Sequence, residues 1–247
     1  MLNYIILGVI QGLTEFFPVS SSAHLVIMQK ILGLSGQELA LSVVLHLGTA
    51  LALILFFFKD ILRLLRDLKS LSLILVVSII TGTIAIAGKD FFEGLFSSPK
   101  LVAVALIITG SILILTRKFM DAKRNNLGIQ DAMILGLTQG IAIVPGISRS
   151  GITISTLLFR KIDRQTSFKF SFLASVPVIL GAALLEAKKI DFALKIEPIN
   201  FAVGFTFSLL SGIFSLWVLK KVLHKAKFHY FGYYCILIAI AALVFVR

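Results

Sequence analysis

Two polar clusters interrupt a chain that is otherwise strongly apolar. The first is the stretch 11–24 (QGLTEFFPVSSSAH), and the second combines Gln139 and Gly140 with the stretch 145–153 (PGISRSGIT). A charged side chain at membrane depth costs roughly 2.5–3.5 kcal/mol on insertion scales, so such groups usually mark a functional site. We predict that the two clusters meet in the folded protein and together hold a phosphate.

The first cluster contains groups suited to an activated nucleophile and to a cation. Ser21 and His24 are three residues apart, so on a helix they share a face, and a hydroxyl beside a histidine is the usual minimal nucleophile pair. Gln11 and Glu15 are four residues apart and also share a face. They predict a divalent-cation site in which Gln11 is a neutral oxygen ligand, which suits Mg²⁺ or Ca²⁺ better than a soft metal.

Both clusters also place hydroxyl groups where a helix begins after a proline. The unpaired N–H groups of a helix N-terminus attract anions, and Ser is a favoured cap there. Arg149 adds a planar cation that can grip a phosphate through two hydrogen bonds. The predicted pyrophosphate-binding residues are Ser20, Ser22, Gly146, Ser148, Arg149, Ser150 and Thr153.

Structural roles remain open for several of these residues. Ser and Thr hydroxyls in membrane helices often bond to their own backbone or to a neighbouring helix. Glu15 and Arg149 could also simply pair with each other, which is compatible with a functional site and with a purely structural role. His46 lies alone in an apolar segment, and we interpret it as a hydrogen-bonded packing residue.

The composition is that of a helical membrane protein. Of the 247 residues, 58% are hydrophobic and only 15% are charged, and the mean hydropathy is +1.01. We expect one integral membrane domain over residues 1–247. The net charge of +12 does not indicate nucleic-acid binding, because the basic residues sit in short loops between apolar segments. The single cysteine, Cys235, excludes an internal disulfide and a cysteine-based metal site.

Hydropathy predicts six full spans and two shorter helical hairpins. The spans are predicted at 40–58, 71–87, 101–116, 168–185, 201–219 and 230–246. The hairpins join 2–13 to 20–32 and 131–144 to 150–159, and each is broken at a proline, Pro18 or Pro145. Such breaks at membrane depth are tolerated only where they are buried in protein or line a wet cavity, so we expect re-entrant hairpins. The segments 59–69 and 88–100 are predicted as loops.

The two halves of the chain resemble each other. The hexapeptide 7–12 (LGVIQG) matches 135–140 (LGLTQG), and Pro18 and Pro145 are each followed by hydroxyl residues. Each half reads as a hairpin plus three spans, with repeats at about 1–118 and 128–247. Because each half has an odd number of spans, the second hairpin would enter the membrane from the face opposite to the first. The two halves would then form an inverted repeat, in which binding sites lie near the midplane of the membrane.

The basic residues support this topology. The segments 59–70, 117–129, 160–169 and 220–228 carry four Lys or Arg each, whereas the segments on the other side carry seven in all. The positive-inside rule makes the richer side cytoplasmic. Both termini, and the opening of the first hairpin, would then face outward.

The motifs 11–24 and 145–153 resemble the two signature motifs of the undecaprenyl-pyrophosphate phosphatases, also called bacitracin-resistance proteins. The resemblance covers the whole chain. It implies an enzyme of the bacterial cell membrane that hydrolyses undecaprenyl pyrophosphate to undecaprenyl phosphate, the lipid carrier recycled for peptidoglycan synthesis. The implied partners are this polyprenyl lipid and the membrane lipids, and an oligomer is possible.

The resemblance also implies residue roles. Glu15 resembles the family's essential acidic residue and metal ligand, Ser21 its proposed nucleophile, and His24 its catalytic histidine, which some mechanisms make the nucleophile instead. We expect Ser21 to attack the terminal phosphorus with His24 as base, and Arg149 to neutralise charge. Many members carry a second Glu where this chain has Gln11, so one anionic ligand of a tight or two-metal site is missing here.

Two other function classes fit parts of the pattern. A polyprenyl-phosphate transporter or flippase would use the same inverted repeat and anion cradle. A metal-independent lipid phosphatase with a histidine nucleophile would share the Ser-Ala-His of 22–24, but this chain has no second histidine in a comparable polar cluster. Release of free phosphate, and its dependence on a cation, would separate the three classes.

Overall fold

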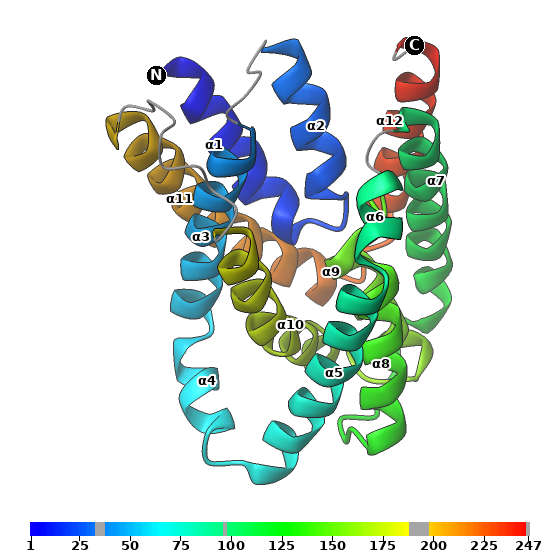
Figure 1. Ribbon diagram of the computed structural model, residues 1–247. Helices are drawn as coiled ribbons and strands as arrows, with labels where there is room; N and C mark the ends of the chain where they lie inside the picture. Colours follow the sequence, from blue (N-terminus) through cyan, green and yellow to red (C-terminus); the bar gives the residue numbers. More distant parts are fainter. Residues whose placement is uncertain (33–37, 96–97, 188–197, 246–247) are drawn as a thin grey trace.

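The computed structural model describes residues 1–32, 38–95, 98–187 and 198–245, and these residues form helices and no strands. Figure 1 shows the arrangement, with both termini at one end of the molecule and the turn after α4 at the other. The elements are α1 (Leu2–Phe16), α2 (Ser21–Ile31), α3 (Glu38–Phe56), α4 (Phe58–Leu64), α5 (Leu68–Ala87), α6 (Lys89–Leu95), α7 (Pro99–Leu115), η1 (Thr116–Phe119), α8 (Ile129–Ile141), α9 (Arg149–Phe159), α10 (Arg164–Ala187), α11 (Pro198–His224) and α12 (Tyr230–Phe245).

Several of these helices are long and apolar enough to cross a membrane. Four pass on length and hydropathy: α5, α7 continued through η1, α10 and α11. The pair α3 and α4, bent by 71°, adds a fifth if it is one span. These match five of the predicted spans, whereas α12 is a shorter apolar helix, and residue 246 lies outside the described residues. The chain is therefore a multi-pass membrane protein.

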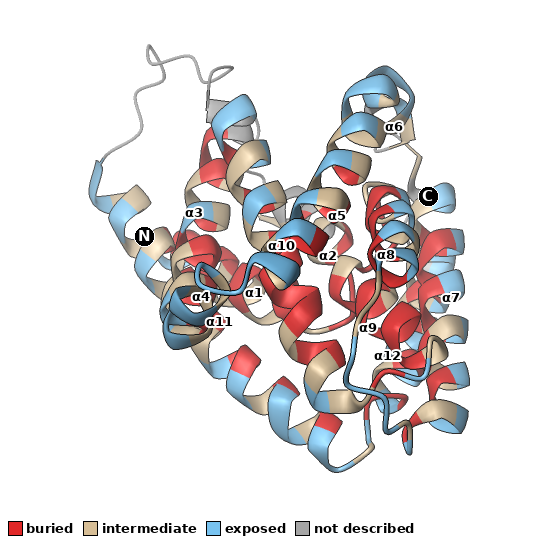
Figure 2. Ribbon diagram, turned by 90° about the horizontal axis from the view of Figure 1, so that it is seen from below, coloured by how far each residue is buried: buried red, intermediate tan, exposed pale blue. Residues whose placement is uncertain are grey.

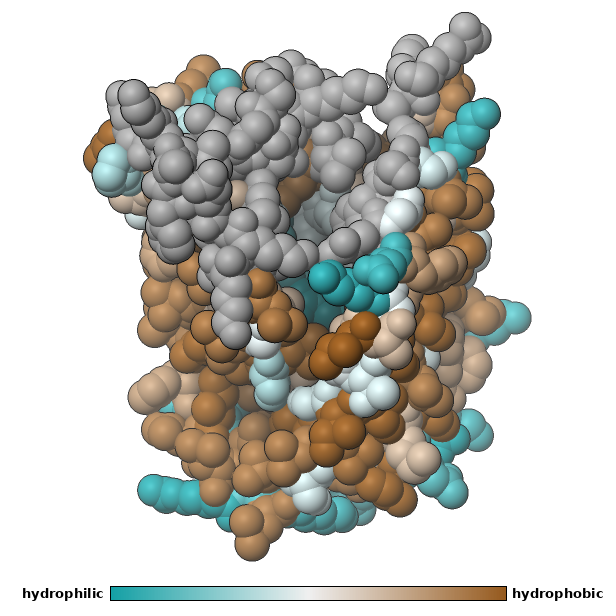
Figure 3. All heavy atoms as spheres, viewed as in Figure 1, coloured by the Kyte–Doolittle hydropathy of each residue, from teal (hydrophilic) through white to brown (hydrophobic). Residues whose placement is uncertain are grey.

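The outer surface agrees with this assignment. Apolar residues cover most of the face in Figure 3, and hydrophilic residues gather at its lower end. Large side chains on α5, such as Leu75, Ile79 and Ile86, are more than half exposed, which suits lipid contact. The buried residues gather inside, and α9 is buried over most of its length (Figure 2).

Both predicted helix breaks are confirmed. The helix α1 ends at Phe16, directly before Phe17 and Pro18, and α2 begins at Ser21. The helix α8 ends at Ile141, and α9 begins only at Arg149. These four helices contain 15, 11, 13 and 11 residues, fewer than the roughly 20 needed to cross a bilayer.

The two predicted loops are wrong in part. Residues 59–69 include the helix α4, and α5 begins at Leu68 because the Asp67 side chain caps it by accepting hydrogen bonds from the N–H groups of Lys69 and Ser70. Within 88–100 lie α6 and the first two residues of α7. Pro99 starts α7 because its fixed φ suits the first helical position and no N–H is needed there.

Small residues bring the first helix of each hairpin into close contact with a long span. The helix α1 packs on α11, and α8 packs on α5. A Cβ atom at Gly12 would lie 2.5 Å from the carbonyl oxygen of Ser208, and one at Gly140 would lie 2.5 Å from the Cδ1 atom of Ile84. Ser215 Oγ also donates a hydrogen bond to the Gly12 carbonyl at 2.8 Å. Glycine allows this approach, as is common between membrane helices.

The tip of the first hairpin is held by α12. Cys235 Sγ donates to the Pro18 carbonyl at 3.4 Å, and the rings of Phe17 and Phe231 lie 5.2 Å apart. The same helix packs along α7. The broken segment around Pro18 is therefore buried within protein, as a non-helical backbone at membrane depth requires.

The four basic segments lie on one face of the molecule. Arg124 N donates to the Lys161 carbonyl at 3.3 Å, and Arg164 Nη1 donates to the His224 carbonyl at 2.8 Å. Lys169 Nζ and Asp60 Oδ1 lie 2.5 Å apart. These contacts connect 59–70, 117–129, 160–169 and 220–228, so the predicted grouping of these loops is confirmed.

Candidate active site

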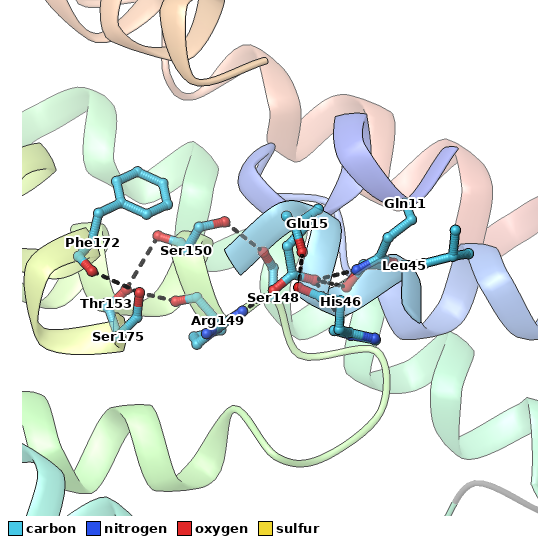
Figure 4. Close-up of polar contacts among 12 residues, drawn as sticks. Gln11, Glu15, Leu45, His46, Ser148, Arg149, Ser150, Thr153, Phe172 and Ser175 are labelled. Atoms are coloured by element: carbon cyan, nitrogen blue, oxygen red, sulfur yellow. Dashed lines mark hydrogen bonds and ion pairs between the residues drawn. The ribbon is translucent and has the colours of Figure 1, made fainter. Parts of the chain in front are cut away.

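The two polar clusters meet through an ion pair between Glu15 of α1 and Arg149 of α9. Arg149 Nη2 donates to Glu15 Oε1, and the Glu15 side chain is only 2% exposed (Figure 4). Ser150 Oγ also donates to the Phe17 carbonyl at 3.3 Å, so the two hairpin tips are in contact. The predicted meeting of the clusters is confirmed.

Glu15 is the centre of this site. Its Oε2 atom accepts a hydrogen bond from Ser21 Oγ at 2.7 Å and another from Gln11 Nε2 at 3.1 Å. Together with Arg149, three donors from three helices converge on one buried carboxylate. A buried charge needs such compensation, and hydrogen bonds to an ionised group are about twice as strong as neutral ones.

The local sequence explains this convergence. Gln11 and Glu15 lie four residues apart on the buried face of α1. The chain then turns back at Pro18, and Ser20 adopts a positive φ of 67° immediately before α2. This uncommon conformation for a residue other than glycine directs Ser21, at the start of α2, towards Glu15.

The expected pairing of Ser21 with His24 is wrong for this structure. Ser21 bonds to Glu15, whereas His24 Nε2 lies 2.9 Å from the hydroxyl oxygen of Tyr234, and His24 Nδ1 lies 2.9 Å from the Ser20 carbonyl. The His24 and Tyr234 rings are also stacked, 5.8 Å apart. The carboxylate of Glu15 is a stronger acceptor for the Ser21 hydroxyl than a neutral imidazole, because it carries a charge.

The hydroxyl groups near the start of α9 are hydrogen-bonded within the protein. Ser148 Oγ caps the helix by accepting from Gly151 N at 3.2 Å, and it lies 3.3 Å from Ser150 Oγ. Thr153 Oγ1 donates to the Arg149 carbonyl at 2.7 Å and lies 2.6 Å from Ser171 Oγ. These contacts are the ones expected if the hydroxyl groups only bond within the protein, and phosphate binding by these residues stays a prediction.

Three further predicted residues lie in the turns or directly next to them. Ser20 Oγ and Ser22 Oγ are 3.2 Å apart at the start of α2. Gly146 has a φ of +94°, and a Cβ atom there would lie 2.4 Å from the Val102 carbonyl of α7. Its own carbonyl accepts from Thr109 Oγ1 at 3.0 Å. Glycine is required at this position by the backbone conformation and by the contact with α7.

A cavity of about 220 Å³ adjoins the ion pair. Its polar residues are Arg149, His46, Gln139 and Thr81, and the rest of its lining is apolar, largely from α10. Arg149 also lines a narrower pocket with Glu15 and the hydroxyl residues of α9 and α10. Arg149 thus lines both spaces, and the larger one places this cation where an anionic group could enter.

The side chains of this site can hold a divalent cation only if the phosphate oxygens of a bound substrate complete the set of ligands. Among the described residues no three His, Cys, Asp or Glu side chains gather in a metal-binding group. However, Gln11 Oε1 is buried and has no hydrogen-bond partner in the described structure, and it belongs to the side chain that contacts Glu15. One carboxylate and one amide oxygen, completed by phosphate oxygens, are a usual set for Mg²⁺.

Comparison with known proteins places the chain in a family. The profile of the family described as "Bacitracin resistance protein BacA" matches residues 4–241. The chain belongs to the BacA family. Members of this family with about the same length are similar to it throughout, so the resemblance seen in the two motifs is confirmed.

Three curated relatives illustrate this similarity, and each is named undecaprenyl-diphosphatase. The protein from Halothermothrix orenii is 40% identical over 97% of this chain and 96% of its own length. That from Carboxydothermus hydrogenoformans is 40% identical over 97% and 95%. That from Thermosipho africanus is 41% identical over 98% of both chains.

Two residues of this BacA-family site were not predicted. His46 Nδ1 lies 2.8 Å from the Ser42 carbonyl, as expected for a hydrogen-bonded histidine, but its Nε2 faces Glu15 Oε2 at 3.8 Å. A signal was present, because Ser42, His46 and Thr49 recur at helical spacing on one face of an apolar span. Tyr234 carries no comparable signal, since only the packing of α12 brings it to His24.

Proposed function

We propose that this BacA-family protein is an undecaprenyl-diphosphatase. It removes the terminal phosphate of undecaprenyl diphosphate and leaves undecaprenyl phosphate, the lipid carrier for peptidoglycan synthesis, thereby conferring bacitracin resistance. The observation that carries this proposal is the Ser21 hydroxyl, which donates to a buried carboxylate whose other oxygen is paired with Arg149. The names of the curated relatives support the same activity.

In the proposed reaction Ser21 is the nucleophile and Glu15 is its proton acceptor. The hydroxyl proton already points at Glu15 Oε2 over 2.7 Å, so it can move to the carboxylate as Ser21 Oγ attacks the terminal phosphorus. The bond from this phosphorus to the bridging oxygen breaks, and undecaprenyl phosphate leaves. Water then attacks the phosphorus of the phosphoserine, the bond from phosphorus to Ser21 Oγ breaks, and inorganic phosphate leaves. The proton held by Glu15 returns to Ser21 Oγ, which restores the hydroxyl and the carboxylate.

Arg149 supplies the main positive charge for the phosphates. A guanidinium has five N–H donors, and the pair with Glu15 uses one nitrogen, Nη2. The others can contact phosphate oxygens in the adjoining cavity. When Glu15 accepts the proton, its attraction for Arg149 falls, and Arg149 can follow the charge that develops on the transferred phosphoryl group.

We also propose that Glu15 and Gln11 hold a divalent cation, Mg²⁺ or Ca²⁺, when the substrate is bound. Such a cation would neutralise charge on the diphosphate oxygens. The support is the unpartnered Gln11 Oε1 beside Glu15.

His24 has a separate position in this proposal. The Ser20 carbonyl can only accept, so His24 Nδ1 carries the hydrogen, and the neutral ring accepts a hydrogen bond from Tyr234 at Nε2. His24 is therefore a base with a defined tautomer, one turn along α2 from Ser21. Attack by His24 on the phosphorus is the second route, and it requires the Tyr234 hydroxyl to move away.

The proposed topology is one domain over residues 1–247 with an inverted repeat. If the repeats are about 1–118 and 128–247, then α1 on α11 and α8 on α5 are corresponding contacts, and α7 on α12 is a contact between corresponding helices. Gly8 and Gly12 of α1 correspond to Gly136 and Gly140 of α8. The basic face is then cytoplasmic, and the termini and the active site face outward.

The test uses purified protein in detergent with undecaprenyl diphosphate, and it follows inorganic phosphate. We expect release that a chelator stops and that Mg²⁺ or Ca²⁺ restores. Ser21→Ala and Arg149→Ala should lose release, whereas Arg117→Ala, an exposed arginine on the basic face, should keep it. Bound lipid without any phosphate release would refute the enzyme and favour the transporter. Release that ignores the chelator would refute the cation.

A further inference from the structure

The histidine beside Glu15 points its unprotonated nitrogen at the carboxylate. His46 Nδ1 lies 2.8 Å from the Ser42 carbonyl oxygen, which can only accept, so Nδ1 carries the hydrogen. In the neutral ring Nε2 then has a lone pair, and this atom lies 3.8 Å from Glu15 Oε2. An imidazole fixed by a hydrogen bond from its other nitrogen to a carbonyl is the usual arrangement of a metal-ligating histidine.

A cation beside His46 would take the place of one of the donors to Glu15 Oε2. This oxygen has about two lone-pair sites and accepts from Ser21 and Gln11, whereas Arg149 donates to Oε1. If the Gln11 amide turns over, its N–H leaves Oε2 and its unpartnered oxygen can face the cation instead. The distance of 3.8 Å from His46 Nε2 is too long for a hydrogen bond, and it is less than two metal–ligand bonds placed end to end, about 4.2 Å. One cation can therefore contact both atoms.

Two more electron-rich atoms lie around this space without a partner in the described structure. They are the amide oxygens of Gln11 and Gln139, whose residues are 0% and 2% exposed. Gln139 lines the 220 Å³ cavity together with His46 and Arg149. Buried amide oxygens are normally satisfied, and a cation with its bound water would satisfy these.

We infer that His46 is a nitrogen ligand of the divalent cation held at Glu15, which makes the site a mixed nitrogen and oxygen site. The inference deepens the proposed function, on which its cation rests. Arg149 would repel a cation in the empty site, so binding should tighten when a diphosphate lies between them. A nitrogen ligand also favours Mn²⁺, Co²⁺ or Zn²⁺ over Ca²⁺, compared with a site built from oxygen alone.

The experiment detects the nitrogen directly, with Mn²⁺ as the probe. Purified full-length protein in detergent is titrated with Mn²⁺, alone and with inorganic pyrophosphate, and bound Mn²⁺ is counted by electron paramagnetic resonance. Electron spin-echo modulation then reports nitrogen bound to Mn²⁺. We expect modulation from one ¹⁴N nucleus, replaced by the ¹⁵N pattern in protein labelled with ¹⁵N-histidine. Because this readout needs only the wild-type protein, no variant has to fold for the inference to be tested.

Variants identify the histidine. His46→Gln should lose the nitrogen modulation and weaken Mn²⁺ binding at least about tenfold, the smallest effect usual for changes around metal sites. His46→Asn is a second amide variant and should give the same two results. His224→Gln, an exposed histidine on the basic face, should change neither quantity. Glu15→Gln should abolish binding.

Several results would overturn the inference. They are wild-type protein that binds Mn²⁺ without nitrogen modulation, modulation that persists in His46→Gln, Mn²⁺ binding that is unchanged in Glu15→Gln, and no Mn²⁺ binding at all. The first is the result expected if a protonated His46 simply pairs with Glu15. Nitrogen modulation in a protein that releases no phosphate would refute the proposed enzyme and leave the ligand assignment standing.

Discussion

Replacing Arg149 with Ala removes both the phosphate cation and the partner of a buried charge. The Glu15 side chain is 2% exposed, whereas that of Arg149 is 24% exposed. The substitution should therefore reduce stability and activity for two separate reasons. A loss of activity alone would not show which of them acts.

The stability loss follows from the contacts of Glu15. Removing one member of a buried ion pair costs about 3–5 kcal/mol, because the other charge stays buried without compensation. Gln11 and Ser21 still donate to Glu15, and water can enter where the part-exposed arginine was. We therefore expect the low end of this range, about 3 kcal/mol. Loss of an arginine that contacts the transferred phosphoryl group costs about 10³–10⁵ in rate.

A double variant separates the two effects. Glu15→Gln combined with Arg149→Ala removes both charges, so its thermal inactivation in detergent should return towards that of the wild type. Its phosphate release should remain lost. Wild-type turnover in Arg149→Ala would refute the role of the arginine. A double variant as unstable as Arg149→Ala would refute the buried ion pair as the cause of the instability.

Three further predictions concern the surroundings of the site. Burial alone would raise the pKa of Asp131, but hydrogen bonds from Arg124, from the Gly128 N–H and from Arg160 lower it to about 2. Asp131→Asn should therefore lower the melting temperature near neutral pH. The difference from wild type should shrink as the pH falls from about 4 towards 2, because these contacts stabilise only the ionised carboxylate. A difference that stays constant with pH would contradict this. Gly12→Val should separate α1 from α11 at a cost of about 1–3 kcal/mol and reduce phosphate release, whereas Gly82→Val, with no atom within 4 Å of its Cβ position, should not. Tyr234→Phe keeps the stacking on His24 but removes the hydrogen bond of about 1 kcal/mol that occupies His24 Nε2. Because Glu15 takes the proton in the proposed reaction, kcat should change little, whereas attack by His24 predicts a rise of up to about fivefold, and such a rise would refute Ser21 as the nucleophile.

Long-range order was predictable where the sequence had a strong periodic or polar signal. Apolar runs located the long spans, and Pro18 and Pro145 located the two helix breaks, because proline cannot continue a helix. The two polar clusters in an apolar chain predicted that the clusters meet, and the pair of Glu15 with Arg149 was one of the alternatives left open. In each case a residue raises the free energy of most alternative structures, as a charged side chain does at membrane depth, so few structures remain.

Local partners were not predictable in the same way. The sequence spacing allowed Ser21 to face His24, but the choice between His24 and Glu15 as partner depends on the Ser20 backbone and on the angle between α1 and α2. The position of Tyr234 depends on how α12 packs against the hairpin tip. The cap at Asp67 and the helix start at Pro99 could be identified from the sequence, but a long hydropathy window does not resolve such ends.

The opposite charges also tie the site to the packing of the two halves. In the proposed repeat, residue 15 corresponds to Ile143, so the second hairpin lacks the carboxylate, and the first hairpin in turn lacks the arginine of α9. Each hairpin alone would bury an uncompensated charge, at a cost of several kcal/mol. The pair is compensated only when both tips meet, as the contacts of Glu15 with Arg149 and of Ser150 with the Phe17 carbonyl show. If the proposed repeat is correct, this difference between its halves makes their correct packing and the completion of the site the same event.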